Sequence, residues 1–406
     1  MVKYVLMLFE VHQPYRLRTG FTNGLLNEVA NLNYGGLQDL LFNSRLNEEI
    51  LRKVSSRCYI PATKLLINSL REFNGFHKVN FSFSGTLLEQ LINHMPEVVE
   101  LFKELVYLEL AEVVAEPYYH SLVSLYDDPS EFTYQVMKQV RNIQELFNTK
   151  VAAFVNTEMI YNELIAEVVR DLGFNAVFTE GVDRILNGRS PNHVYSASCG
   201  IKVLTRNYRL SDDIAFRFSN KSWDQYPLFA DKYVDWLLRS PGDLIVIAMD
   251  YETFGEHHSA DTGIFDFLAH LFKLMAKEGI QTLSVSEAIS LFDPVDSFKV
   301  PVDETISWAD VEKDLSAWLG SEEQRTIFNR HKSLLKLLKD LGDDELIRIW
   351  RYLSTSDHLY YMSSKGGASG EVHRYFSPYG PPTNAYCLLS AALTVLELSI
   401  LRPQIR

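Results

Sequence analysis

Residues 244–258, with the sequence LIVIAMDYETFGEHH, join a short apolar run to a dense cluster of acids and histidines. A continuous apolar run of this length is typical of a strand that is buried in a parallel sheet. In α/β barrels the catalytic side chains stand just past the carboxyl ends of such strands. Asp250, the first polar residue after the run, is therefore a candidate catalytic acid. The alternative is an exposed loop after a core strand, and a second acid in an equivalent position would favour catalysis.

Strand-like runs recur through the first 290 residues and alternate with segments of helical spacing, such as residues 164–172, which end at Gly173. This alternation predicts an α/β fold with a parallel sheet. Because polar residues follow nearly every run, we favour a closed barrel, and the pattern leaves seven or eight strands open. The expected strands are residues 4–9, 79–83, 113–115, 151–155, 176–179, 214–218, 244–249 and 282–285.

The pattern changes after residues 293–294 and is helical from Trp308 onward. We therefore expect a catalytic barrel over residues 1–295 and an α-helical domain over 296–406 that contributes to the active cleft. A long loop is expected at 354–382, since Ser, Gly, Tyr and Pro dominate there. The expected helices are 333–341, ended by Gly342, then 344–353, capped by Asp343, and finally 383–401.

Charge and cysteine content exclude several classes of protein. The net charge is −13 and no stretch is dense in Lys or Arg, which argues against nucleic-acid or membrane partners. The three cysteines lie far apart and match no zinc or redox spacing, so a cytoplasmic protein without disulfides is expected. The N-terminus is typical of a first strand rather than a signal peptide. The apolar stretch 387–401 is too short to cross a bilayer, so we expect a buried helix.

Glu158 supplies the second carboxylate, because it directly follows an apolar run and precedes a helical segment. Barrel closure would bring the ends of both strands to one rim, where Glu158 and Asp250 could face one substrate. An ionised carboxylate that attacks the anomeric carbon and a protonated one that serves the leaving oxygen suffice for glycoside cleavage. Structural caps or ion pairs are the alternative roles for both acids.

His12 and His120 also stand at predicted strand exits, where neutral imidazoles could donate to sugar hydroxyls. Each could equally be a hydrogen-bonded rim residue without a role in binding. The chain contains no Gly-x-Ser-x-Gly motif and no phosphate-binding glycine loop after a strand.

A metal site is the competing interpretation of the same histidines. His257 and His258 with Asp261 could be ligands, as could Glu10 with His12. Metal sites need three or four convergent ligands. Adjacent histidines on a strand or helix point apart, so at most one of this pair is expected to enter a site.

Five short segments occur in order along the chain: His12-Gln13-Pro14, residues 85–89 (GTLLE), Asn156-Thr157-Glu158 with Tyr161, residues 249–255 (MDYETFG), and Ser356-Asp357-His358 with Tyr360-Tyr361-Met362. In this order they resemble the conserved blocks of glycoside hydrolase family 57, and in particular those of its α-amylase-like members. Segments 116–120, 206–213 and 308–318 also look like the α-amylase-like branch of this family.

The resemblance implies a distorted, TIM-like (β/α)7 barrel followed by a helical domain, and a retaining enzyme that acts on α-1,4-glucans without a metal or organic cofactor. Glu158 would be the nucleophile and Asp250 the acid/base, with their carboxyls about 5–5.5 Å apart. Substrate contacts are expected from His12, Gln13, His120, Asp213, Glu252, His257, Trp308, Asp357 and His358.

Other functions stay open at this stage. A 4-α-glucanotransferase or branching enzyme would use the same two acids with a sugar as acceptor, and the small residues at 366–370 (GGASG) bear on that choice. A glucan-binding protein without activity would often have lost one acid. A metal-dependent barrel hydrolase would be expected to carry a His-x-Asp pair after its first strand, which this chain lacks.

Overall fold

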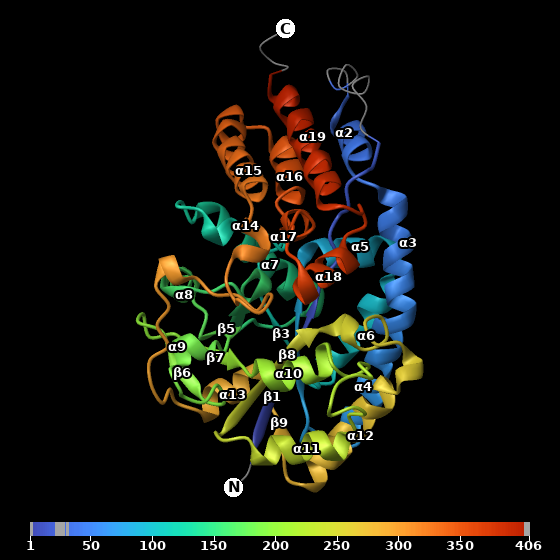
Figure 1. The fold of residues 1–406 in the computed structure, drawn as a ribbon, viewed down its shortest axis with the longest axis vertical. Coiled ribbons are helices and arrows are strands. Elements are labelled where there is room, and N and C mark those ends of the chain that lie inside the picture. The colour runs from blue at the N-terminus through green and yellow to red at the C-terminus, as the bar shows by residue number, and fades with distance from the viewer. Residues whose placement is uncertain (1–2, 21–28, 30–31, 402–406) are drawn as a thin grey trace. The chain divides into compact units, whose positions relative to one another are not determined.

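The computed structural model describes residues 3–20, 29 and 32–401 (Figure 1). The chain forms two compact units. The barrel unit comprises Met1–His12, Ile50–Tyr118 and Thr133–Trp308, and the helical unit comprises Gln13–Glu49, Tyr119–Phe132 and Ala309–Arg406. Two early segments of the chain therefore group with the C-terminal helices, and residues 296–308 group with the barrel.

Seven parallel strands form the barrel in the order β3-β2-β1-β8-β7-β5-β4. A parallel bridge between Ala115 and Phe154 joins the two ends of this order, so the sheet is nearly closed. The seven-stranded α/β barrel followed by helices is thus confirmed. The strands are β1 (Tyr4–Val11), β2 (Val79–Phe83), β3 (Ala111–Val114), β4 (Ala153–Val155), β5 (Ala176–Glu180), β7 (Lys202–Arg206) and β8 (Leu244–Asp250), with the short β6 (Val194–Ser196) beside β7 and β9 (Gln281–Thr282) beside β1.

The strand predicted at residues 214–218 is wrong. These residues end helix α10 (Tyr208–Ala215) and begin the turn after it, and the barrel strand is β7. Asn207 starts the helix because its side-chain oxygen accepts from the backbone N–H of Leu210 at 3.1 Å. The strand predicted at 282–285 is also shorter than expected, since Ser284 caps helix α13 (Val285–Leu291).

Alternate residues of the strands fill the barrel interior with apolar side chains. This inner cluster includes Leu6 and Leu8 of β1 and residues 244, 246 and 248 of β8, with contributions from the other strands. Side chains on a strand alternate between its two faces. The next residues of the same phase, such as Glu10 and Asp250, therefore face the interior one layer above the cluster.

Helices cover the outside of the barrel. The strand residues that point outward, toward these helices, are apolar as well. Phe81 of β2 packs against Phe9 and Phe102, with ring centroids 5.4 and 5.5 Å away. The helices of this unit are η2 (Ser55–Tyr59), α4 (Ile60–Arg71), α5 (Gly85–His94), α6 (Pro96–Tyr107), α7 (Ser130–Phe147), α8 (Glu163–Asp171), α9 (Asp183–Leu186), α10, α11 (Ala230–Arg239), α12 (Ile264–Lys277) and α13, and α3 (Ser44–Val54) leads into η2.

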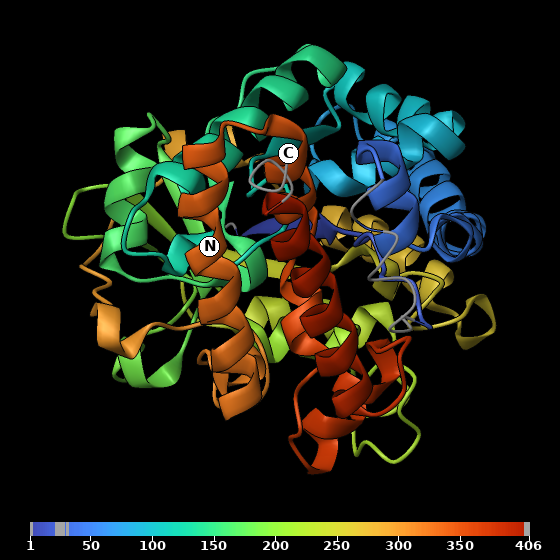
Figure 2. The ribbon, with the colours of Figure 1, turned by 90° about the horizontal axis from the view of Figure 1, so that it is seen from above.

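The helical unit is built around α15, which packs against α16 and α19 (Figure 2). Gly342 ends α15 in a left-handed conformation and Asp343 caps α16, as expected. The long loop predicted at 354–382 is wrong, because two helices lie within it. The helices of this unit are α2 (Tyr34–Leu41), α14 (Ser316–Leu319), α15 (Glu322–Leu341), α16 (Asp344–Tyr352), α17 (Ser356–Tyr360), α18 (Gly367–Phe376) and α19 (Pro382–Ile400).

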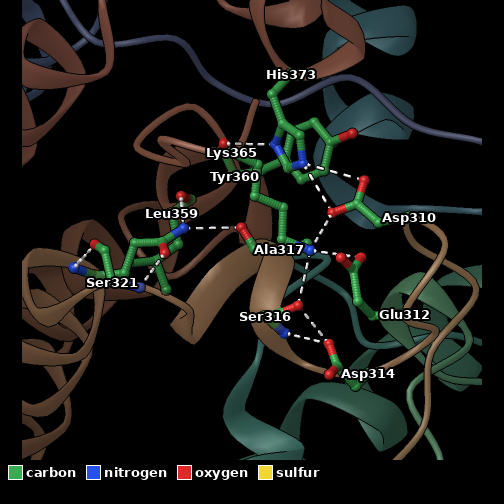
Figure 3. Close-up of polar contacts among 11 residues, drawn as sticks. Asp310, Glu312, Asp314, Ser316, Ala317, Ser321, Leu359, Tyr360, Lys365 and His373 are labelled. Carbon is green, nitrogen blue, oxygen red and sulfur yellow. Dashed lines mark hydrogen bonds and ion pairs between the residues drawn. The ribbon is translucent and has the colours of Figure 1, made fainter. Parts of the chain in front are cut away.

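A polar cluster explains why α18 forms although its first turn is rich in glycine (Figure 3). The ammonium of Lys365 lies 2.7 Å from Asp310 Oδ2 and 2.9 Å from Glu312 Oε2. His373 of α18 lies 3.1 Å from the same Asp310 oxygen, and its ring stacks on Tyr360 with centroids 3.8 Å apart. Tertiary contacts from the segment before α14 therefore hold this helix in place.

Helix α19 is long and apolar enough to span a membrane, judged by length and composition alone. It begins at Pro382, so the length argument used for residues 387–401 does not apply to the whole helix. Leu389, Leu393 and Leu396 are buried, and the helix packs against α15, α16 and α17. One side of α19 is thus buried within the helical unit.

Candidate active site

The interior of the barrel changes from apolar to charged at the carboxyl ends of its strands. Glu10 and Asp250 are direct neighbours on β1 and β8, and Glu180 and Arg206 are direct neighbours on β5 and β7. Glu180 and Arg206 are almost completely buried, with 0% and 2% of their surface exposed. Charged groups that are buried at one rim of a barrel are a frequent mark of an active site.

Glu158 stands directly after β4, in the turn η4 (Thr157–Met159), in an unusual backbone conformation. Its φ is 57° and that of Met159 is 52°, so two side-chain-bearing residues in succession are left-handed. Each costs roughly 1–2 kcal/mol relative to the right-handed form. Asn156 stabilises the turn, because its side-chain amide donates to the carbonyl of Ile160 at 2.9 Å. The backbone thus directs the Glu158 side chain at a cost that the surrounding structure offsets.

Trp308 holds the Glu158 carboxylate. Its indole Nε1–H donates to Glu158 Oε2 at 2.7 Å, and its backbone N–H donates to the Glu158 carbonyl at 3.1 Å. Trp308 also packs against the inner cluster of the barrel. An N–H donor stabilises the charge of a carboxylate, so this contact suits an acid that acts in its ionised form.

Arg206 is a buried residue of the rim that the sequence did not single out as a site residue. Its guanidinium donates to Glu180 at 2.9 Å, to Asp212 at 2.6 Å and, through Nε, to the carbonyl of Ala248 at 2.7 Å. Burial by itself would lower the pKa of Arg206, but Asp212 and Glu180 outweigh burial and raise it. Arg206 is the last residue of β7, and the wrong prediction of a strand at 214–218 is the reason why it was not identified as a strand-end residue.

The turn after Asp250 is hydrogen-bonded to residues of the π-helix η2. Cys58 of η2 donates its S–H to the carbonyl of Tyr251 at 3.1 Å, and the hydroxyl of Tyr59 donates to Glu252. Burial raises the pKa of the Cys58 thiol well above its usual value, so the thiol stays a neutral donor. Glu252 is 6% exposed. These contacts hold Glu252 within the turn that follows Asp250.

The predicted site residues His12, Asp213 and His257 lie in the barrel unit. His12 follows β1, and its Nδ1 lies 2.7 Å from the hydroxyl of Ser84. Asp213 lies on α10 and pairs with Arg217 at 2.6 Å; burial raises the pKa of Asp213 and Arg217 opposes that rise. Burial, with a smaller contribution from His258, lowers the pKa of His257 to about 4. The imidazole of His257 is therefore neutral at pH 7.

The alternative of a metal held by His257, His258 and Asp261 does not fit the contacts of His258. Its Nε2 lies 2.9 Å from the carbonyl of Ile214 and so carries the hydrogen. Its Nδ1 then accepts from the hydroxyl of Ser219 at 2.8 Å. Since both ring nitrogens are engaged by the protein, His258 has no lone pair to offer to a metal ion.

Four predicted site residues, Gln13, His120, Asp357 and His358, belong to the helical unit. Gln13 accepts from Arg16 at 2.8 Å, and Asp357 accepts from the hydroxyl of Tyr361 at 3.1 Å. His120 is left-handed, with φ 49°, and its carbonyl accepts from the N–H of Ser356 at 2.9 Å. The structure thus brings His120 next to the start of α17, which carries Asp357 and His358.

Comparisons with known proteins show to which family the chain belongs. The family model described as Glycosyl hydrolase family 57 matches residues 6–301. A Methanocaldococcus jannaschii protein that is provisionally named an alpha-amylase is 44% identical over 387 residues, which cover 93% of this chain and 80% of that protein.

Solved structures show the same fold. A GH57-type branching enzyme from Pyrococcus horikoshii matches with a TM-score of 0.69 at 16% sequence identity. The matched region covers 98% of this chain and 95% of the branching enzyme. A 4-alpha-glucanotransferase from Thermococcus litoralis matches with a TM-score of 0.56 at 18% sequence identity. The matched region covers 89% of this chain and 50% of the glucanotransferase. At these identities the likeness concerns the fold alone. The family match and the relative at 44% identity carry the assignment: the chain belongs to glycosyl hydrolase family 57, a family of enzymes that act on α-glucans by hydrolysis or transglycosylation.

Proposed function

We propose that this protein is a retaining glycoside hydrolase of the α-amylase type that cleaves α-1,4-glucans, with Glu158 as nucleophile and Asp250 as general acid/base. The observation that carries the proposal is the position of the two acids. Asp250 has the interior phase of β8, and Glu158, beyond β4, is bonded to a tryptophan that packs against the same interior. Two acids at the carboxyl rim of one barrel are the arrangement that this reaction needs.

The reaction follows from the different surroundings of the two acids. Glu158, ionised and stabilised by the Trp308 N–H, attacks the anomeric carbon, while Asp250 gives its proton to the leaving glycosidic oxygen. The resulting glycosyl ester is broken when Asp250 removes a proton from the acceptor, which attacks the same carbon and frees Glu158. Glu10 neighbours Asp250 in the sheet. Two neighbouring carboxylates disfavour double ionisation, so one acid of this pair can hold the proton that the first step needs.

The remaining predicted residues complete the proposal. In the barrel unit, His12, Asp213, Glu252, His257 and Trp308 would bind sugar hydroxyls and rings or support the acids. Gln13, His120, Asp357 and His358 of the helical unit would contribute in the same way. The two carboxylates and an acceptor suffice for the chemistry, so the proposal includes no metal or organic cofactor. We also propose a cytoplasmic location, which the free thiols of Cys58, Cys199 and Cys387 support.

Glu158→Gln tests the mechanism. The amide keeps the size of the side chain but is a far weaker nucleophile, so we expect the turnover of maltoheptaose to fall at least about 1,000-fold. Binding of maltoheptaose, measured by calorimetry, should remain within about threefold of the wild type. Glu167→Gln is the matched control, since Glu167 is exposed on the neighbouring helix α8. Activity of Glu158→Gln close to that of the wild type would disprove the assignment.

The products of the wild-type enzyme distinguish hydrolysis from transfer, because the two reactions differ only in the acceptor. Incubation with maltoheptaose in buffer that contains a chelator should give shorter oligomers and reducing ends that increase with time. Oligomers longer than the substrate, with a constant number of reducing ends, would instead identify a 4-α-glucanotransferase. New branch points would identify a branching enzyme, and loss of activity in the chelator would show that a metal is required.

A further inference from the structure

We propose that Arg206 is a positioning residue that sets the geometry of both catalytic acids, because it contacts both the strand that ends in Asp250 and the tryptophan that is hydrogen-bonded to Glu158. The inference rests on the proposed roles of Glu158 and Asp250. Arg206 lies at the end of β7, between the strand that carries Asp250 and the tryptophan that holds Glu158.

The connection to Asp250 runs through the backbone of β8. The Nε–H of Arg206 donates to the carbonyl of Ala248 at 2.7 Å, two residues before Asp250. The N–H of Ala248 donates in turn to the hydroxyl of Ser211 at 3.1 Å. β7 and β8 are paired in register at Arg206 and Val246. The backbone carbonyl and N–H of Ala248 are therefore hydrogen-bonded by two side chains rather than by a neighbouring strand. These two bonds hold β8 in place two residues before Asp250.

The connection to Glu158 runs through Trp308. The guanidinium of Arg206 lies over the indole ring, 5.6 Å from the centroid. A planar cation over an aromatic face attracts the ring and restricts its tilt. The tilt of the indole decides where Nε1–H points, and this group donates to Glu158 Oε2 at 2.7 Å.

Two acids keep the guanidinium in its place. Glu180 and Asp212 each bond a different terminal nitrogen, at 2.9 and 2.6 Å. Together with the Nε–H bond to Ala248, these contacts engage all three nitrogens of the side chain and fix its plane. Lysine carries the same charge but has neither the plane nor the forked donors. A purely electrostatic role in the core would tolerate lysine far better than a positioning role would.

Arg206→Lys and Trp308→Phe form the test, with kinetics on an aryl maltooligoside over a range of pH. Arg206→Lys should lower kcat about 10- to 100-fold, the usual effect of misplaced catalytic groups, and change KM less than threefold. The acidic limb of kcat/KM should move to higher pH in both variants, because each weakens the donor to the ionised Glu158. The double variant should lose less activity than the product of the two single losses, since Arg206 acts on Glu158 through Trp308.

Arg209→Lys is the matched control. Arg209 also lies over an aromatic ring, that of Tyr208 at 5.6 Å, and also pairs with a carboxylate, but its side chain is 72% exposed. Its kinetics should equal those of the wild type. Asp212→Asn serves as a second variant if Arg206→Lys does not fold, since it removes one anchor and leaves the pair with Glu180. It should shift the acidic limb in the same direction, by a smaller amount.

A folded Arg206→Lys with wild-type kcat and pH profile would overturn the inference, as would a loss confined to KM or a fully multiplicative double variant. Glu158→Gln, measured in the same assay, separates this outcome from failure of the proposed function. If Glu158→Gln is inactive while Arg206→Lys is normal, the mechanism stands and only the positioning role is lost. If Glu158→Gln is active, the proposed function itself fails.

Discussion

At the scale of single residues, the turn after β8 depends on one position that tolerates no side chain. Gly255 has φ 116°, and a Cβ added there would lie 2.0 Å from the carbonyl oxygen of Arg57. Arg57 belongs to the π-helix η2, which also supplies the bonds of Cys58 and Tyr59 to the same turn. The glycine lets two segments distant in sequence approach closely behind the proposed acid/base.

Gly255→Ala should therefore destabilise the protein by about 3 kcal/mol or more, because the backbone conformation is strained and the carbonyl of Arg57 must move. Gly263→Ala is the control, since Gly263 also has a positive φ, of 82°, but nothing lies within 4 Å of an added Cβ. It should cost only about 1 kcal/mol. The midpoints of urea unfolding measure both changes. Equal losses in the two variants would show that the contact with Arg57 does not matter.

At the scale of elements, the pattern of residue types and the observed structure disagree in two places. The residues of α10 have a strand-like composition near 214–218, but the cap at Asn207 starts a helix before them. The glycine-rich start of α18 predicts a loop, yet the contacts of Lys365 and His373 with Asp310 hold the helix. Gly370 is required there, because a Cβ would lie 2.0 Å from the carbonyl oxygen of Lys365. Residue propensities alone miss the local cap at Asn207 in the first place and the distant partner Asp310 in the second.

Asp310→Asn tests the anchoring of α18. Burial would raise the pKa of Asp310, but the bonds from His373 and Lys365 outweigh burial and lower it. Because the pKa is depressed on folding, the contribution of Asp310 is present above its usual value of 3.8 and is lost as the pH falls through the lower folded value. At pH 7 the variant should lose about 1.5–3 kcal/mol.

The loss from Asp310→Asn should shrink as the pH falls below about 4, because protonation of Asp310 then weakens the wild type as well. Urea unfolding at pH 7 and at pH 3 measures both values. Asp303→Asn, at an exposed position, should change stability by less than about 0.5 kcal/mol at either pH. A loss from Asp310→Asn that is the same at both values of pH would contradict the ionic role.

At the scale of the whole molecule, each unit buries a histidine that must be neutral to fit. In the barrel unit, His77 donates from Nε2 to the carbonyl of Phe272 at 3.0 Å, and its Nδ1 accepts from the N–H of Thr282 at 3.4 Å. In the helical unit, His331 lies between Tyr126, at 3.0 Å, and the carbonyl of Trp350, at 2.9 Å. Burial lowers the pKa of both to about 4.

Stability should therefore fall as the pH is lowered from 6.5 to about 4. In this window the unfolded chain binds protons that the folded protein excludes, so the free energy of unfolding decreases by up to about 3 kcal/mol for each histidine. Below pH 4 this contribution levels off. The free energy of unfolding of each protein is compared with its own value at pH 7.5. Between pH 6.5 and about 4, the pH dependence of this free energy in His77→Gln should correspond to about one proton fewer than in the wild type. A slope equal to that of the wild type would show that His77 does not exclude a proton.

By itself, the sequence determined the α/β alternation, the helical C-terminal region, the strand-end positions of Glu158 and Asp250, and the family. These features depend on periodicity and on short motifs, which are local. Only the tertiary structure decided which strand precedes α10, which residues hold Glu158, and that Arg206 connects Trp308 with β8. Such contacts join residues 42 to 150 positions apart. They exist only because the barrel closes and brings the ends of separate strands to one rim.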